Sequence, residues 1–416
     1  MNQRSTNIDW PDALELGPVT VLTGLDKGKY PHGNSILVHG SHETILIDPS
    51  LTVAHRGAPI QVDQIFLSHV HEDHIPGISQ LKDVPVSCHE EDAVGLTSID
   101  GLMSMYGFPQ PVEEEFRQEV IEDFNYEPRS DVSTFSDGDV FDLGGAEIQV
   151  AHTPGHTRGH CAFLIPQARA VFLGDIELSG FGPYYFDAHS SLDSFEQSLH
   201  RCRSLDADHF ITFHHKWVIS GRESFLEILD DFERVISNRE SAMLDFMREP
   251  KSVANCASQR FVYRPSVDMS IVDHVETRSA QIHIARLMDQ GRVDERWIEL
   301  DYGEWDEKPI GEIAKEEWVR WRSDPAFTPP GGESLEELDR RVALGCEALL
   351  LEAEESNVAV FTHVSPIKSA VSWALGTAEQ ISWNLSVGQA QITRIAVRDG
   401  RPVLTSFNET GHLKKR

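Results

Sequence analysis

Residues 68–74 read Ser68-His69-Val70-His71-Glu72-Asp73-His74, which places three histidines and an aspartate within six residues. This stretch follows Gln64–Leu67, an apolar run that predicts a buried strand. In an extended or turning segment His69 and His71 point the same way, whereas Asp73 and His74 can face a second point. Imidazole and carboxylate groups are ligands that zinc and similar metals prefer. A lone histidine is most often structural, but four such groups would each need a buried partner, so the stretch favours a metal site.

Further ligand candidates follow other apolar runs. Glu147–Val150 leads into His152-Thr153-Pro154-Gly155-His156, Ala170–Leu173 into Gly174-Asp175, and His209–Phe213 into His214-His215. Each pairing alone is weak evidence, because an aspartate after a strand is usually a helix cap. Side chains at the ends of neighbouring strands can converge on one point, as a metal cage requires. Together with residues 69–74, these stretches predict a metal centre at the carboxyl ends of several strands.

The series His69-x-His71-x-Asp73-His74, Thr153–Thr157, Gly174-Asp175 and His214 resembles the ligand series of the metallo-β-lactamase superfamily over roughly residues 18–240. Asp48 and Ser136–Asp139 also match that family's pattern. The resemblance implies an α/β protein with a four-layer αββα fold over residues 1–250. It also implies two zinc ions per chain, with iron or manganese as alternatives. One zinc would be held by His69, His71 and His156, the other by Asp73, His74 and His214, and Asp175 would bridge them; His215 is a less favoured alternative to His214.

The resemblance further implies a hydrolase in which a zinc-bound hydroxide is the nucleophile. Asp73 is the expected catalytic residue, because it could pass the proton to the leaving group. His152 and His160 are expected to be either partners of the ligands or satisfied polar residues. The expected substrate is a small ester, thioester or lactone.

Two segments are candidates for the wall of the pocket. Residues 95–130, which are acidic and dotted with aromatics, suit an irregular insertion over the site better than a core element. The run Phe181–Phe186 is aromatic, although ordinary loop packing explains it equally well. Lys216 and Arg158 could face a substrate anion, but ordinary solvated charge is the slightly favoured interpretation.

The C-terminal part resembles a second family. Trp297–Trp305, Pro330–Ser334, Val360–Val364 and Asn408–Leu413 are similar to the second half of the histidine phosphatase (phosphoglycerate-mutase-like) family. The match would make Glu299 a proton donor and His363 a phosphate-pocket residue. That family's chemistry depends on an Arg-His-Gly segment whose histidine becomes phosphorylated, and this chain contains no Arg-His-Gly. We therefore expect a smaller, inactive α/β domain over residues 294–416, used for packing, dimerisation or binding.

Residues 251–293 are expected to form a helical linker or tail between these domains. Its helix, Val272–Gln290, fits either the small helical tail of lactamase-fold hydrolases or, through Arg278–Gln281, the arginine helix of the phosphatase family. The tail is favoured, because the missing nucleophile leaves Arg278 little to assist. Farther along the chain, the pattern predicts a helix over Ser334–Glu355 and a strand over Val358–Thr362.

In the first half, the pattern predicts a hairpin of Ser35–His39 and Thr44–Asp48. It also predicts helices over Leu192–Leu205 and Ser224–Ile236, where apolar residues recur at intervals of three and four.

The net charge of −31 repels phosphate backbones and anionic lipids, so nucleic acid and membranes are not expected partners. The five cysteines are scattered, which disfavours both disulfides and a cysteine-built metal site. No apolar run approaches the roughly 20 residues that span a bilayer, and Met1–Leu16 lacks the features of a secretion signal. These features predict a cytoplasmic protein with a small-molecule substrate, and a homo-oligomer stays open.

Three other functions compete with the small-molecule hydrolase. A phosphodiesterase or nuclease on the same fold is disfavoured by the acidic surface. A metal-dependent binding or sensor protein without turnover is disfavoured by the intact ligand series. A di-iron redox enzyme is disfavoured because no flavin- or iron–sulfur-binding segment follows.

Overall fold

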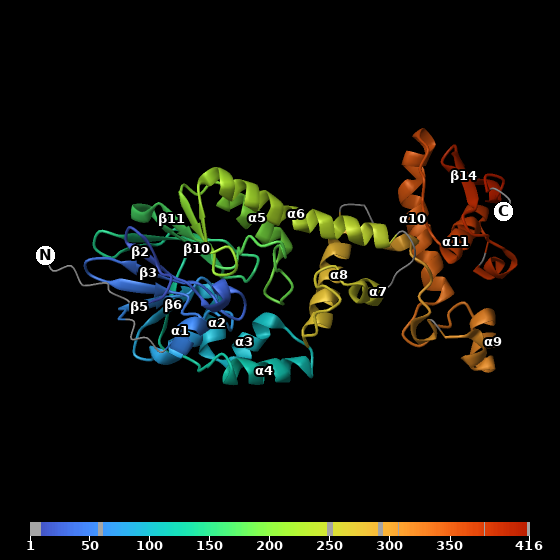
Figure 1. The fold of residues 1–416 in the computed structure, drawn as a ribbon. Coiled ribbons are helices and arrows are strands. Elements are labelled where there is room, and N and C mark those ends of the chain that lie inside the picture. The colour runs from blue at the N-terminus through green and yellow to red at the C-terminus, as the bar shows by residue number, and fades with distance from the viewer. Residues whose placement is uncertain are drawn as a thin grey trace. The chain divides into compact units, whose positions relative to one another are not determined.

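The computed structural model describes residues 10–56, 61–247, 253–289, 294–306, 308–377 and 379–413. The chain divides into two compact units (Figure 1). Unit 1 comprises residues 1–247 and 251–283, and unit 2 comprises residues 284–416 with 248–250. Gln290, the last residue of the predicted helix Val272–Gln290, lies outside the described residues, as do residues 251–252 and 291–293 of the predicted linker.

Unit 1 contains two β-sheets. The first has seven strands in chain order: β1 (Leu14–Leu16), β2 (Val19–Leu22), β3 (Ser35–His39), β4 (Thr44–Ile47), β5 (Gln64–Phe66), β6 (Val86–His89) and β7 (Val132–Phe135). The second has six strands in the order β13 (Val218–Ser220), β12 (His209–Ile211), β11 (Ala170–Phe172), β10 (Cys161–Ile165), β9 (Glu147–His152) and β8 (Val140–Asp142). The first sheet is antiparallel up to β4 and parallel from β4 to β7, and in the second only β11 and β12 are parallel.

The strands are apolar on both sides because both faces of each sheet are covered. In β3, Ile36 and Val38 belong to a core shared with the second sheet, whereas Leu37 belongs to a separate core on the other face. Successive side chains of a strand point to opposite faces, so this division follows directly from the sequence. Phe163 and Phe172 of the second sheet meet Ile36 and Val38 in the shared core.

Helices complete the four αββα layers (Figure 1). The outer face of the first sheet packs on residues from α1 (Leu51–Arg56), α2 (Ala93–Thr97), α3 (Ile99–Tyr106) and α4 (Val112–Glu122). The outer face of the second packs on residues from α5 (Leu192–Cys202), α6 (Arg222–Phe246) and α8 (Val272–Asp289), and α7 (Val253–Gln259) lies between the last two in sequence. Short 3-10 helices are η1 (Leu25–Gly28), η2 (Pro76–Gln80), η3 (Glu90–Asp92), η4 (Pro166–Ala168), η5 (Glu295–Trp297), η6 (Gly303–Trp305), η7 (Ile310–Glu312) and η8 (Glu379–Asn384).

Unit 2 contains α9 (Lys315–Ser323), α10 (Leu335–Glu355) and α11 (Val364–Leu375), with a hairpin of β14 (Ile392–Arg398) and β15 (Arg401–Glu409). Its core includes Trp305, Trp321, Leu338 and Val342. The α10 helix starts with a capping box, in which Ser334 and Glu337 satisfy each other's backbone amides.

The predicted hairpin, the apolar strands and the helices at 192, 272 and 334 are confirmed within one to three residues. Helix α6 continues to Phe246, ten residues past the predicted end at Ile236. The extension was hidden because Arg239 stands at a buried position of that helix, where it donates to the carbonyls of Phe181 and Pro183. Among the described residues, no helix has the length and apolar character needed to cross a membrane.

Two predictions were wrong. Residues 95–130 are not an irregular insertion: they contain α3 and α4, and Met105, Phe116 and Val120 are buried in the core of the first sheet. Acidic residues on the outer face of α4 concealed its helical period. Val358–Thr362 forms no ladder with any described strand, and no backbone hydrogen bond joins it to another described segment.

Phe66 of β5 offers a test of the shared core. Its ring is fully buried and lies 5.4 Å from Phe135 and 6.0 Å from Phe163, measured between ring centroids. We expect Phe66→Ala to lower the free energy of unfolding of unit 1 by about 3–5 kcal/mol, because it leaves a cavity between the sheets. Calorimetric unfolding measures this, with the exposed Phe361→Ala as control. Equal stability of both variants would contradict the packing described.

Candidate metal centre

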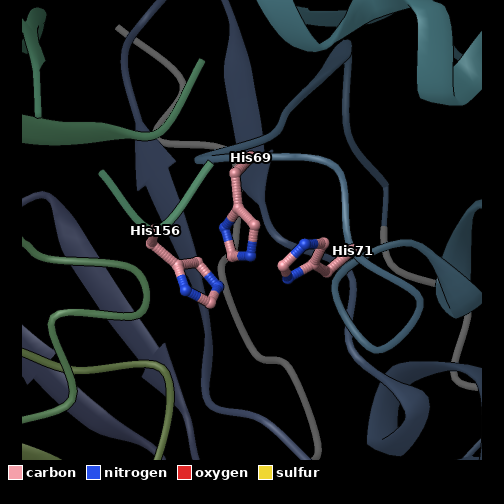
Figure 2. A group of neighbouring side chains, drawn as sticks. All are labelled: His69, His71 and His156. Atoms are coloured by element: carbon pink, nitrogen blue, oxygen red, sulfur yellow. The ribbon is translucent and has the colours of Figure 1, made fainter. Parts of the chain in front are cut away.

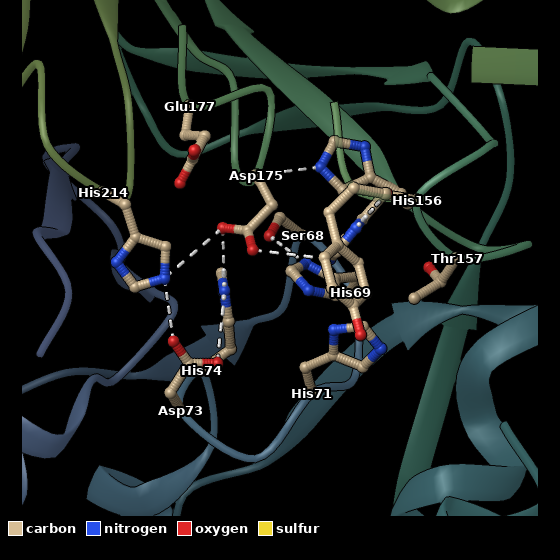
Figure 3. Close-up of polar contacts among 12 residues, drawn as sticks. Ser68, His69, His71, Asp73, His74, His156, Thr157, Asp175, Glu177 and His214 are labelled. Carbon is tan, nitrogen blue, oxygen red and sulfur yellow. Dashed lines mark hydrogen bonds and ion pairs between the residues drawn. The ribbon is translucent and has the colours of Figure 1, made fainter. Parts of the chain in front are cut away.

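The residues predicted as ligands come together beyond the carboxyl ends of four strands. The loop 68–74 follows β5 of the first sheet, whereas His156, Asp175 and His214 follow β9, β11 and β12 of the second. Figure 3 shows these side chains pointing toward one another from both sheets. The site therefore lies at one edge of the sandwich, where the two sheets contribute opposite walls.

His69, His71 and His156 form one cluster, which we call cluster A (Figure 2). One nitrogen of each ring lies within 4.8 Å of the others, and all three rings are buried. Among the described residues, none offers a hydrogen bond to the Nε2 atom of any of the three. Buried polar atoms are normally paired, so three unpaired nitrogens aimed at one point suit a bound cation.

Asp73, His74 and His214 form a second group, cluster B, whose ligand atoms also lie within 4.8 Å of one another. Asp73 Oδ2 stands 2.8 Å from His214 Nε2, and Asp73 Oδ1 stands 3.8 Å from His74 Nε2. All three side chains are buried. Two imidazoles and a carboxylate are again a typical set of zinc ligands.

Asp175 lies between the clusters and presents one oxygen to each (Figure 3). Its Oδ1 is 3.1 Å from His74 Nε2 in cluster B, and its Oδ2 is 3.4 Å from His156 Nε2 in cluster A. A carboxylate in this position can bridge two cations.

In three of the ligand histidines, the Nδ1 atom on the far side of the ring from the site has a hydrogen-bond partner in the protein. His156 Nδ1 lies 3.0 Å from the carbonyl of Tyr184, and His214 Nδ1 lies 2.8 Å from the carbonyl of Gly28. His74 Nδ1 lies 2.8 Å from Asp48 Oδ2. A carbonyl or carboxylate accepts a hydrogen bond from Nδ1–H. In a neutral ring this leaves the lone pair on Nε2, directed into the site.

Asp48 organises the ligand loop. It accepts from Ser68 N at 2.7 Å, from Ser68 Oγ at 2.5 Å and from His74 Nδ1. The only hydroxyl proton of Ser68 is then used, so Ser68 Oγ accepts from His69 Nδ1 at 3.1 Å. One buried carboxylate thereby orients His69 in cluster A and His74 in cluster B.

Two further buried residues join the ligand loops. Asp92 accepts from Thr157 Oγ1 at 2.6 Å and from Gly159 N at 2.8 Å. His160 Nε2 accepts from Asp175 N at 3.1 Å, so it positions the bridging aspartate. Gly174 is required beside it, because an added Cβ would lie 2.7 Å from His160 Nε2 and the backbone φ is +52°.

Glu72 positions a side chain that packs against cluster A. Its carboxylate accepts from Tyr30 Oη at 3.0 Å and from Tyr106 Oη, and the Tyr106 ring stacks on His71 at 4.9 Å. Asp187 Oδ2 stands 3.5 Å from His71 Nε2. The roles of Asp92, Tyr106 and Asp187 could not be predicted from the sequence, because none belongs to a ligand motif and their partners are distant in sequence.

Other predicted residues lie outside both clusters. His152 donates to or accepts from no ligand; its Nε2 contacts the carbonyl of Arg158, and its ring stacks on His89. His215 is exposed, with its Nε2 3.6 Å from Glu177 Oε2. Lys216 and Arg158 are exposed.

The electrostatics differ among the ligand residues. Burial lowers the pKa of His69 and His71 well below the usual histidine value, and neighbouring imidazoles lower it further. Burial also opposes protonation of His214, but the carboxylates of Asp175 and Asp73 outweigh it and raise the pKa to about 10. Burial would raise the pKa of Asp175, but His74 and His214 hold it well below its usual value. Asp175 is therefore ionised, as a bridging ligand must be.

Family models match both units. Residues 30–214 match the model of the metallo-beta-lactamase superfamily. Unit 1 is a metallo-beta-lactamase superfamily domain. A metallo-beta-lactamase family protein from Thermus thermophilus has the same fold, with a TM-score of 0.51 and 20% identity over 66% of this chain and 94% of that protein. The metallo-beta-lactamase fold implies a dinuclear metal site, and the three groups of ligand atoms fit it.

Residues 277–410 match the model of the histidine phosphatase superfamily (branch 1). This match begins inside α8, although Val275 and Ile282 of that helix pack in the core of unit 1. The phosphatase-like segment brings two predicted residues together: His363 precedes α11, and the nearby Glu299 carboxylate accepts from Ser365 N at 3.1 Å.

Curated relatives cover parts of the chain. A hydroxyacylglutathione hydrolase from Ruegeria pomeroyi is 28% identical over 210 residues, which are 47% of this chain and 67% of that protein. A bifunctional protein from Mycobacterium tuberculosis is 32% identical over 125 residues, 29% of this chain. The match spans only 34% of the length of that protein and of two further mycobacterial relatives.

Asp48 offers a test of the ligand scaffold. We expect Asp48→Asn to weaken binding of zinc by about 10–100-fold, because an amide NH2 replaces one of the two acceptor oxygens, so that at least one hydrogen bond from Ser68 or His74 is lost. Competition with a chromophoric chelator measures the affinity, and the exposed Asp142→Asn serves as control. An unchanged affinity in Asp48→Asn would contradict the scaffold role.

His214 gives the metal-free domain a pH dependence. Its folded pKa of about 10 exceeds the ordinary 6.5, so its proton stabilises the fold fully below about pH 6.5, and this contribution is lost as pH rises through 10. In the presence of a chelator, we expect the free energy of unfolding of unit 1 to fall between about pH 7 and 10. Urea titrations of the parent and of His214→Gln measure it. An equally steep fall in the variant would contradict the assignment.

Proposed function

We propose that unit 1 is a zinc-dependent hydrolase that holds two zinc ions and acts on a small ester, thioester or lactone. The observation that carries the proposal is the position of Asp175, with one oxygen facing each histidine cluster. Seven ligand-type side chains meet there from distant parts of the sequence, namely His69, His71, Asp73, His74, His156, Asp175 and His214. If the site served only to stabilise the fold, the Nε2 atoms of His69, His71 and His156 would not be buried without hydrogen-bond partners, because burying unpaired polar atoms costs free energy.

When bound, two zinc ions would supply an activated water and polarise the substrate's carbonyl oxygen. The residues of the chain fix where this happens. His69, His71 and His156 would hold one ion, and Asp73, His74 and His214 the other. Asp73 Oδ1, which is 3.8 Å from His74 Nε2, is the oxygen that could accept a proton and return it to the leaving group.

The choice of zinc rests on the donor set. Five imidazoles and two carboxylates, with no thiolate, suit zinc, and iron or manganese are the alternatives. All five cysteines are buried, and no disulfide joins any two of them. This supports a reducing, cytoplasmic location as part of the proposal.

The substrate class rests on the relative from Ruegeria pomeroyi, whose name denotes hydrolysis of an acylglutathione. Its similarity covers less than half of this chain, so only the chemical class is carried over. The net charge of −31 argues against a nucleic acid substrate or a membrane partner. We propose a small acyl compound, and no catalytic role for unit 2.

We expect variants of unit 1, but not of unit 2, to lose hydrolase activity. His156→Ala and Asp175→Ala should each lower thioesterase activity by about a hundredfold or more, because each removes a metal ligand. His363→Ala in unit 2 should leave this activity unchanged. Turnover of ester, lactone, thioester and phosphodiester substrates is measured together with the zinc content of each variant.

Two outcomes would overturn the proposal. Full activity in Asp175→Ala would exclude a dinuclear centre as the catalyst. Faster turnover of the phosphodiester than of any acyl substrate by the parent would move the assignment to a phosphodiesterase.

A further inference from the structure

Unit 2 contains a strand-like segment without a strand partner. Val358, Val360 and Thr362 line one cavity, whereas the Phe361 side chain between them is 95% exposed. This alternation has the period of two of a β-strand. Within the described part of the chain, no backbone hydrogen bond joins residues 357–362 to another segment. The side chains of Val358–Thr362 are therefore arranged as in a sheet, but their amides and carbonyls are unpaired.

A second unpaired edge faces the same cavity. Strand β14 pairs with β15 along one edge, and no described strand pairs with its other edge. Thr393, Ile395 and Val397 are alternate residues of β14, and all three line the cavity. Two extended segments thus border one space without bonding to each other.

The cavity itself is apolar. It has a volume of about 180 Å³, and no charged residue lines it. Helices α10 and α11 (Figure 1) form its floor with Leu349, Leu350, Ile367, Ala370 and Trp373. It opens to solvent, because Val360 lines it and is still 40% exposed.

We propose that this cavity accepts an extended, apolar segment of a partner protein, inserted as a strand between Val358–Thr362 and β14. Such a segment would pair its backbone on both edges and place alternate apolar side chains on α10 and α11. A compact apolar ligand would fill the cavity but would leave both rows of amides and carbonyls unpaired. The unpaired amides and carbonyls of Val358–Thr362 and β14 therefore favour an occupant in the extended conformation of a strand.

A second copy of this chain is the poorer occupant. In the described residues, the strands of unit 1 are all paired within two sheets, and β15 is paired with β14. The remaining strand-like segment, Val358–Thr362, forms the wall of the cavity itself. Among the described residues, a second copy thus offers no free apolar strand unless part of it unfolds.

Hydrogen exchange of the full chain tests the premise. We expect the amides of Val358–Thr362 to exchange rapidly, while those of the middle of α10 and α11 are protected. Strong protection of Val358–Thr362 in a monomeric sample would mean that this segment already pairs with β14, and would overturn the proposal. Protection that rises together with dimerisation, followed by light scattering, would assign the cavity to a second copy and would also overturn it.

Peptide binding tests the occupant. The probes are fluorescent seven-residue peptides with an apolar run flanked by charged residues. The first is Glu-Thr-Ile-Leu-Ile-Asp-Pro, which in this chain forms the buried β4 and its flanks and serves here only as a model strand sequence. We expect at least one to bind saturably and to slow exchange of Val358–Thr362. N-methylation of either alternate set of its amides should weaken binding about tenfold or more, because each set bonds to a different edge.

Matched variants of the full chain complete the test. Val360→Asp should abolish binding of the peptide, since it places a carboxylate in the apolar cavity, whereas Phe361→Ser should preserve it. The helical content of both variants is checked by circular dichroism, and Ile395→Asp on the opposite wall repeats the test should Val360→Asp unfold unit 2. Failure of every peptide to bind, or binding unaffected by Val360→Asp, Ile395→Asp and N-methylation, would overturn the proposal.

Discussion

The metal centre of unit 1 is built on buried imidazole nitrogens that converge around the carboxylate of Asp175, and three of them, the Nε2 atoms of His69, His71 and His156, have no hydrogen-bond partner among the described residues. Burying such groups without partners costs free energy, and the cost is tolerated where a cation satisfies them. The fold of the domain positions these groups. Two sheets bring strand ends together, and the shared aromatic core keeps those ends at fixed positions. Removing the cations should therefore affect stability as well as activity.

Orientation of the ligands depends on a small number of buried carboxylates. Asp48 acts on both clusters through Ser68 and His74, and Asp92 connects the loop at 68–74 with the loop at 153–160 by accepting from Val70 N as well as from Thr157 and Gly159. Loops carry the ligands, and these hydrogen bonds connect the loops to one another. In unit 2, by contrast, the extended backbone of Val358–Thr362 has no hydrogen-bonded partner strand among the described residues, and the apolar cavity beside it is open to solvent.

Much of this was accessible from the sequence. The apolar runs at residues 35–39 and 44–48 predicted a hairpin that forms part of the first sheet, and the ligand spacing between 69 and 74 predicted the metal centre. Helix α4 was missed because its outer face is acidic, and the end of α6 because a buried Arg239 interrupts the apolar period. Tyr106 and Asp187 were missed because their roles arise only from tertiary contacts with Glu72 and His71. For Val358–Thr362 the local pattern was that of a strand, but pairing depends on a neighbour that local sequence cannot supply.

Anomalous X-ray diffraction from crystals of the zinc-loaded chain tests the central claim most directly. The account predicts two zinc peaks about 3.5–4 Å apart, one within bonding distance of His69, His71 and His156 and the other of Asp73, His74 and His214. The Asp175 carboxylate should contact both. A single peak, or two peaks of which neither contacts Asp175, would contradict it.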